Sequence, residues 1–507
     1  MSIKDFMFRA RSRALVRTGF FRSDPAPPAS PYYFIDPEGP LFSVANEFRY
    51  TDDPTMKNPI LERSNVGMGM LLTNSKTCNL EFINMFYRKL RDLEVNTLKR
   101  FTAVTASDRS LLVGPIGLRH LLLLSEAGEP GIDILIESLR NQADLALVVS
   151  DYFKPLVTLM NASDSGIALA ALANTSGCFK DSVFQFNLVK YGYVPTGGLS
   201  FVLAQTPWSI GEFLALTSRT LRAQDILFCR LVKRWISPEA FGFMEVTSEH
   251  KLGVSEKDAN LLLEEHFLSP PMDWSLKPFI NTIQEAFGND HFEDVVKALQ
   301  RSASSSDVKI SAFAAECLDR MNQSDPLALR LTFKLIKRTR KHLADVKSGI
   351  QIEQGEETLN FMERRSRIRQ EHILKPAMIE SLKDEIRVAS RLVPMDSFKA
   401  SLHAFIVGQE RPLSELKMSA GEFETFFDPI ERDYMYSERS DFPLSAHPKL
   451  RKFHPDFNPQ TGLDHDPQFM ARETQRWSRE YLKTKTDQVR RAVTGLSELN
   501  NSNISWD

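Results

Sequence analysis

The pattern of apolar and polar positions predicts short buried strands alternating with helices in the first half of the chain. Apolar runs at 66–72, 101–105 and 156–160 have the length and composition of buried strands. Residues 79–93 carry Phe, Met and Leu side chains at helical spacing, so a helix is expected between the first two strands. Short strands that alternate with helices are typical of an α/β fold. The predicted fold class is therefore α/β.

The rest of the chain has a different pattern. Residues 207–345 read as mainly helical, and a charged helix is expected at 468–493 within a tail rich in Pro and aromatic residues. These changes predict five segments: a basic arm at 1–30, an extended lead-in at 31–60, a core at 61–270, a helical region at 271–427 and a partner-binding extension at 428–507.

Composition argues against several classes of protein. Of the 507 residues, 25% are charged and 42% hydrophobic, which is ordinary for a globular chain. No run approaches the roughly 18–20 apolar residues that a transmembrane helix needs, so no membrane partner is expected. The four cysteines and ten histidines show no metal-ligand spacing, so no metal and no cofactor are predicted. A net charge of −2 argues against a protein embedded deep in nucleic acid.

The first 30 residues are basic and amphipathic. They contain five arginines and one lysine against two aspartates, with apolar residues interleaved. Such a segment is typical of a mitochondrial presequence, so a location in the mitochondrial matrix is predicted. A disordered basic arm is the alternative, and the two interpretations are compatible.

Two glycine-containing turns carry the most specific motifs. One lies at 164–166, and the other, at 191–198, reads Tyr-Gly-Tyr-Val-Pro-Thr-Gly-Gly. With the segments at 211–217 and 223–225, they resemble the enoyl-CoA hydratase (crotonase) superfamily, and within it the 3-hydroxyisobutyryl-CoA hydrolases. The resemblance covers roughly residues 60–410. It implies a crotonase-like spiral of ββα units with a C-terminal helical region and extended N- and C-terminal arms.

The resemblance also implies where catalytic groups should lie, and three of these positions are degenerate. In the family, backbone N–H groups of glycine turns hold the thioester oxyanion, and a Glu and an Asp supply proton transfer or a nucleophile. Gly166 matches a glycine of the first turn, but the flanking glycines are replaced by Asp164, Ser165 and Ala168. Leu188 stands in place of the Glu and Thr196 in place of the Asp. No Glu occurs between Glu137 and Glu212. No catalytic residue is therefore assigned, and a pseudoenzyme is predicted.

Other interpretations of these turns stay open. Gly166 is also explained by a tight turn between a strand and a helix. Asp164 or Asp181 could replace the missing acids, although an Asp in a loop is more often a helix cap or a solvated turn residue. If Pro115 occupies the donor position of the second oxyanion loop, that position has no N–H at all.

Basic residues concentrate in the second half of the chain and are candidates for binding RNA or protein partners. The candidates are Lys337, Arg338, Arg340 and Lys341 at an expected helix end, Arg364, Arg365 and Arg367, Lys449, Arg451 and Lys452, and Arg472, Arg476, Arg479, Arg490 and Arg491. Cations mixed with aromatic residues suit phosphates and unstacked bases. Each cluster is also explained as a solvated helix face, and the first as a complement to a helix dipole.

The leading hypothesis is a structural component of a mitochondrial assembly, built from an inactive acyl-CoA hydrolase. The chain resembles the hydrolase-derived proteins of the mitochondrial ribosomal small subunit, which implies ribosomal proteins and rRNA as partners. The residues alone indicate only a non-catalytic scaffold with partner-binding arms. Two alternatives stay open: an active CoA-thioester hydrolase or enoyl-CoA hydratase, and a pseudoenzyme that senses CoA, although no CoA ligand is expected.

Overall fold

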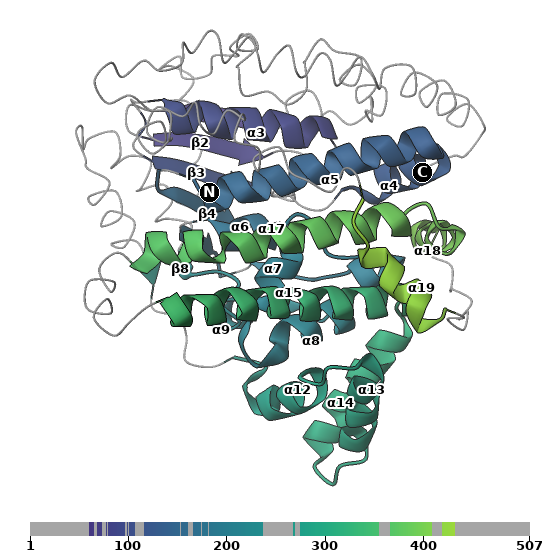
Figure 1. Cartoon of the computed structure of the whole chain (residues 1–507). Coiled ribbons are helices and arrows are strands. Elements are labelled where there is room, and N and C mark those ends of the chain that lie inside the picture. Colours follow the sequence, from purple (N-terminus) through teal and green to yellow (C-terminus); the bar gives the residue numbers. More distant parts are fainter. Residues whose placement is uncertain are drawn as a thin grey trace, which may run out of the picture.

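A seven-stranded sheet and a set of long helices make up the molecule, which Figure 1 shows as a computed structural model. The structure describes residues 60–64, 68–73, 78, 80–96, 99, 101–106, 116–152, 154–160, 166–173, 175–180, 182–236, 267–268, 274–353, 366–407 and 418–430. The basic arm expected at 1–30 and the charged helix expected at 468–493 lie outside these residues. The division into five segments therefore stays a prediction.

The sheet is parallel at its centre and antiparallel at both edges. Its order is β1 (Ile60–Ser64), β2 (Met68–Thr73), β3 (Phe101–Ala106), β4 (Leu156–Met160), β5 (Thr175–Cys178), β8 (Arg234–Ile236) and β9 (Phe267–Leu268). Strands β2, β3, β4, β5 and β8 run parallel, whereas β1 and β9 run antiparallel to their neighbours. Central parallel strands are buried on both faces, which explains the largely apolar sequences of β2 and β4. A separate antiparallel pair joins β6 (Val183–Phe184) to β7 (Leu221–Arg222).

Alternate residues of the sheet belong to two different cores. Met70, Ala103 and Val157 belong to a small cluster on one face, while Leu71 and Val104 belong to the main core. This alternation follows from the two-residue period of a strand. The main core is large and also takes in apolar residues from the helical region.

The helices pack against the sheet and against each other. They are α3 (Leu80–Val95), α4 (Leu118–Glu126), α5 (Glu129–Ser150), α6 (Ile167–Leu172), α7 (Leu199–Ala204), α8 (Ile210–Thr217), α9 (Ala223–Phe228), α12 (Ile280–Phe287), α13 (Phe292–Ala303), α14 (Val308–Asn322), α15 (Pro326–Glu353), α17 (Ser366–Leu392), α18 (Asp396–Val407) and α19 (Ala420–Glu424). The long helices α15 and α17 pack side by side, and both contact α7. Helices α12, α13 and α14 form the tapering lower part of Figure 1.

These elements confirm the predicted α/β class. The strand expected at 156–160 has the bounds of β4, and the helix expected at 79–93 is α3. The described part of 207–345 is mainly helical as expected, but the short strands β7, β8 and β9 interrupt it.

One prediction about the basic residues on α15 is wrong. The basic run from 334 to 342 was expected at a helix end, but it lies in the middle of α15, which continues to Glu353 and has no basic residue in its last turn. These charges therefore do not complement the C-terminal end of a helix dipole, an effect confined to the last turn.

No helix in the described ranges is both long enough and apolar enough to cross a bilayer.

Candidate functional site

The second glycine turn is closely packed against α5. It follows the short helix η2 (Leu188–Tyr191) and leads into α7. Gly197 and Gly198 have φ values of 68° and 86°, a region that glycine enters without steric cost. A Cβ at Gly197 would lie 2.8–2.9 Å from three atoms of the Gln142 side chain. The turn therefore requires glycine both for its backbone conformation and for its contact with α5.

The three positions that the family resemblance assigns to catalysis are buried. Leu188 begins η2 and is 1% exposed, so its apolar side chain fills part of the core. Thr196 is 3% exposed, and its side chain lies beside the buried hydroxyl of Tyr193. Gly166 precedes α6 with φ −73°, a conformation open to any residue. Neither Leu188 nor Thr196 has a side chain that exchanges protons near neutral pH. The alternative acids, Asp164 and Asp181, lie outside the described residues.

A carboxylate that the sequence analysis missed lies at this turn. Glu385 of α17 accepts hydrogen bonds from the backbone N–H of Gly198 at 2.8 Å and of Ser200 at 2.8 Å. It also accepts one from the Ser200 hydroxyl at 2.5 Å. Since α7 begins at Leu199, the carboxylate caps this helix and faces the positive end of its dipole. Both carboxylate oxygens are therefore bound to the turn.

Burial dominates the acidity of this carboxylate. Removal from water raises the pKa of Glu385 from 4.5 to about 7, although the hydrogen bonds from Ser200 and Gly198 act to lower it. Glu385 is 1% exposed. The sequence does contain a signal for this: Glu385 stands between Leu382 and Ala389 at helical spacing, within an otherwise apolar face.

Arg340, one of the predicted partner-binding residues, is committed to a buried acid. Its guanidinium forms two hydrogen bonds with the carboxylate of Glu212 on α8, at 2.6 and 2.8 Å. It also donates to the Thr206 carbonyl at 3.3 Å. The Glu212 side chain is 0% exposed, so its charge is separated from water and neutralised by this arginine. The pair ties α15 to α8.

Arg338 and Lys337 are also bound within the protein. Arg338 donates to Asp384 of α17 at 2.9 Å, and Lys337 donates to the Gly288 carbonyl at 3.0 Å. Burial alone would raise the pKa of Asp384, but hydrogen bonds from His342 and Arg338 hold it below its ordinary value. Asp384 is therefore a carboxylate at neutral pH and binds α15 to α17.

Of the four candidates on α15, Lys341 is the exposed one. Arg367 lies in the first turn of α17. The remaining candidates lie outside the described residues: Arg364, Arg365, Lys449, Arg451, Lys452, Arg472, Arg476, Arg479, Arg490 and Arg491. Partner binding by all of these residues stays a prediction, and three of those on α15 already have internal partners.

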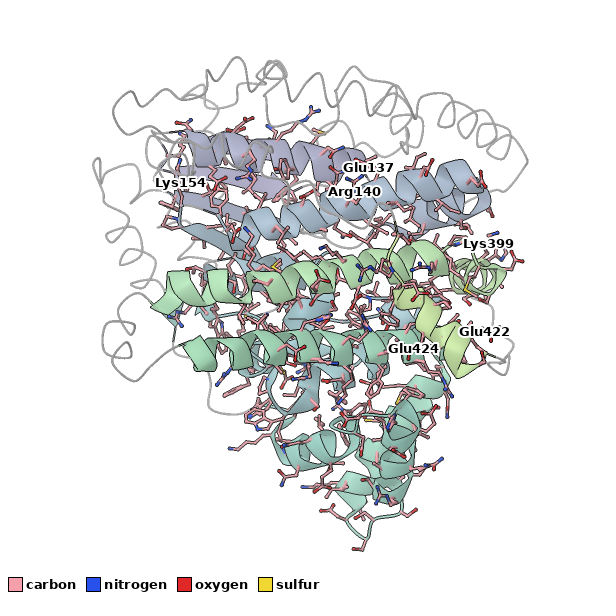
Figure 2. All side chains as sticks on the ribbon, in the orientation of Figure 1. Glu137, Arg140, Lys154, Lys399, Glu422 and Glu424 are labelled. Atoms are coloured by element: carbon pink, nitrogen blue, oxygen red, sulfur yellow. The ribbon has the colours of Figure 1, made fainter. Side chains whose placement is uncertain are left out.

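Glu137, the last glutamate before the stretch without glutamate, forms an ion pair inside the protein. Glu137 and Arg140 lie on α5 (Figure 2), with the Arg140 guanidinium 3.3 Å from the Glu137 carboxylate. Asn141 donates to the same carboxylate at 3.1 Å. Both charged side chains are almost fully buried, and all three residues lie on α5, so this group neutralises a buried charge within one helix.

Burial shifts the pKa of two cysteines and one histidine away from neutral pH. Burial raises the pKa of Cys178 to about 12 and that of Cys317 to about 12, so both remain thiols at neutral pH. Burial lowers the pKa of His120 to about 4, so its imidazole is neutral. Within the described ranges, no three His, Cys, Asp or Glu side chains are grouped to hold a metal ion.

Comparison with known proteins identifies the family to which this fold belongs. Residues 81–357, more than half of the chain, match the enoyl-CoA hydratase/isomerase family. The chain therefore belongs to this family. A carnitinyl-CoA dehydratase from Mycobacterium thermoresistibile shares the fold, with a TM-score of 0.58 and 16% identity over 74% of this chain and 97% of that chain.

Two relatives resemble the chain more specifically. The small ribosomal subunit protein mS47 of Arabidopsis thaliana is 21% identical over 61% of this chain and 75% of its own length. The mitochondrial 3-hydroxyisobutyryl-CoA hydrolase-like protein 1 of the same organism is 24% identical over 56% of this chain and 71% of its own length. Both resemblances predicted from the sequence are confirmed.

Proposed function

We propose that this protein is a structural component of the small subunit of the mitochondrial ribosome and has no acyl-CoA hydrolase activity. The resemblance to mS47 supports a place in the ribosomal small subunit. The presequence-like first 30 residues support the mitochondrial location. The observation that carries the loss of activity is the burial of Leu188 and Thr196 at the two positions where the family resemblance expects acids.

The expected loss in catalytic rate distinguishes a slow enzyme from a scaffold protein. A positioned general acid or base contributes about 10²–10⁴-fold to the rate. Neither leucine nor threonine has a side chain that gives up or takes up a proton near neutral pH. Tyr193 beside Thr196 does not substitute, because burial raises the pKa of its hydroxyl well above the ordinary value. If the two contributions multiply, losing both groups lowers the rate by about 10⁴–10⁸-fold.

One observation favours the alternative of an active hydrolase. The pKa of Glu385, about 7, is suited to general acid–base catalysis near neutral pH. Against this, the carboxylate is bound to the backbone amides of Gly198 and Ser200 and to the Ser200 hydroxyl. Those amides are occupied and do not stabilise an oxyanion. We therefore assign Glu385 a capping role.

Two measurements test the proposal. Tagged full-length protein should sediment with small-subunit rRNA in a gradient of mitochondrial lysate prepared at low magnesium, and migration as a free protein would refute the ribosomal role. The purified protein should release no CoA from 3-hydroxyisobutyryl-CoA above the buffer rate. Turnover that is lost in Glu385→Gln but kept in Glu380→Gln, a matched change on the same helix, would establish the alternative instead.

A further inference from the structure

Three aromatic rings form a row at the surface, outside the glycine turn. Phe228 at the end of α9 stacks on Trp274 with ring centroids 5.1 Å apart, and Trp274 faces Trp208 at 6.4 Å. Trp208 lies in the short helix η3 (Pro207–Ser209) and is 45% exposed. Phe228 and Trp274 are half-buried beneath it. We call these three residues the aromatic row.

Exposed cations flank the aromatic row. Arg230 follows Phe228 by two residues, and the backbone N–H of Lys277 donates to the Trp274 carbonyl at 3.3 Å. Arg222 is held near the same place, because its backbone N–H and that of Ser275 both donate to Asp225. The side chains of Arg222, Arg230 and Lys277 are all exposed.

The two acids in the described residues 205–236 are both buried. Residues 205–236 contain two acids, Glu212 and Asp225, which are 0% and 3% exposed. Glu212 is paired with Arg340, and Asp225 accepts hydrogen bonds from Ser275 at 2.7 and 3.0 Å. Residues 274–279 contain no acid, and Asp273, which precedes Trp274, lies outside the described residues. Within 205–236 and 274–279, the exposed charged side chains are therefore cationic.

The backbone of this surface is strained at two of its exposed residues. Trp208 has φ 53° and Arg230 has φ 60°, in the left-handed region that disfavours residues with a Cβ. Glycine adopts such φ values without steric cost. A large exposed side chain in an unfavourable backbone conformation indicates a role other than folding stability.

We infer that the aromatic row and its three cations bind unpaired nucleotides of an RNA, with a base stacked on Trp208. Aromatic platforms surrounded by Arg and Lys are the arrangement that single-stranded nucleic acids use, because bases stack on the rings and phosphates contact the cations. A structured protein partner would place its own acids opposite these cations, but it would not require stacking on a tryptophan. The inference rests on the proposed function, since the small subunit supplies the RNA.

The positive φ values of Trp208 and Arg230 make substitution by glycine a suitable test. Trp208→Gly and Arg230→Gly each remove one contact with RNA while relieving an unfavourable φ. Trp208→Gly also loses packing against Trp274, so circular dichroism is used to check that both variants are folded. Ser218→Gly is the matched control, because Ser218 has φ 50° but is fully buried. Phe405→Ala controls for loss of an exposed aromatic ring elsewhere, since Phe405 is 42% exposed.

The assay is fluorescence anisotropy of the purified full-length protein with a labelled 20-nucleotide oligouridine. Wild type should bind, with affinity that falls as salt rises. Trp208→Gly should lower the affinity about tenfold, in line with the loss of one stacked base, and Trp208→Phe should retain most of it. Arg230→Gly should lower the affinity and reduce its dependence on salt. Ser218→Gly and Phe405→Ala should bind as the wild type does.

Other results of the anisotropy assay overturn the inference. No binding by the wild type, or equal binding by wild type and Trp208→Gly, shows that the aromatic row is not an RNA platform. If Trp208→Gly fails to enter the small subunit while its oligouridine affinity is unchanged, the surface binds a protein. Wild type that stays outside the small subunit refutes the proposed function alone, because the anisotropy result decides the inference independently.

Discussion

Replacing Arg340 with leucine should destabilise the isolated protein, without involvement of any partner. The change leaves the carboxylate of Glu212 buried at 0% exposure and without its two hydrogen bonds at 2.6 and 2.8 Å. Breaking a buried ion pair on one side costs about 3–5 kcal/mol. Two features reduce this: the Arg340 side chain is 30% exposed, and Lys337 remains 3.9 Å from Glu212. We therefore expect a loss of about 2–3 kcal/mol in the free energy of unfolding.

Urea unfolding followed by circular dichroism measures this loss. Lys341→Leu is the matched control, because Lys341 is the exposed neighbour of Arg340 and should change stability by no more than about 0.5 kcal/mol. The double variant Glu212→Leu with Arg340→Leu should recover most of the loss, since apolar replacement of a whole buried pair is often neutral. If Arg340→Leu unfolds at the same urea concentration as Lys341→Leu, the structural assignment is wrong and Arg340 is again a candidate for partner binding.

Three further predictions concern stability. Because burial raises the pKa of Glu385 from 4.5 to about 7, the folded state binds more protons than the unfolded state between these values, so stability should fall by ~3 kcal/mol as pH rises through that window. Glu385→Gln should flatten this part of a pH series, and a wild type equally stable at pH 5 and pH 8 would contradict the assignment. Gly197→Ala should cost at least ~1 kcal/mol more than Gly128→Ala, because both have positive φ but only the first also meets a side chain of α5; equal losses in urea would disprove the close contact. Lys154 (Figure 2) donates to two carbonyls at the end of α3, at 2.8 and 2.5 Å. Lys154→Met should therefore lower the free energy of unfolding by about 1–3 kcal/mol. Lys399→Met, which breaks an exposed ion pair, should leave the melting temperature unchanged.

The sheet was more predictable from the sequence than the contacts of the helical region. Strands β3 and β4 are short continuous apolar runs, and such a run is a local property of the sequence. The partners of the basic residues are not local. Arg340 meets Glu212 across 128 residues of chain, so the sequence shows the charge without showing what neutralises it. A charge that is buried in the fold and a charge that awaits a partner look alike in the sequence.

The candidate site was predictable only as far as family motifs reach. Leu188 and Thr196 follow from their places in the glycine-turn motifs, and the structure adds that both are buried. Glu385 carries no motif, because its role depends on the way α17 crosses the start of α7. The strained φ of Trp208 is likewise set by the packing around η3 and leaves no trace in residue composition.

The order of the strands has a consequence for how the chain matures. Strands β2, β3, β4 and β5 lie side by side in the order in which they are synthesised, so a chain that emerges amino end first can add them one at a time. The amides of Gly198 and Ser200, however, find their acceptor 187 and 185 residues later, on Glu385. A nascent or partly translocated chain that ends before Glu385 contains every strand of the described sheet. The amides at the start of α7 and the core beside them are still uncovered in such a chain. Chaperones would have to shield that core until the last third of the polypeptide arrives.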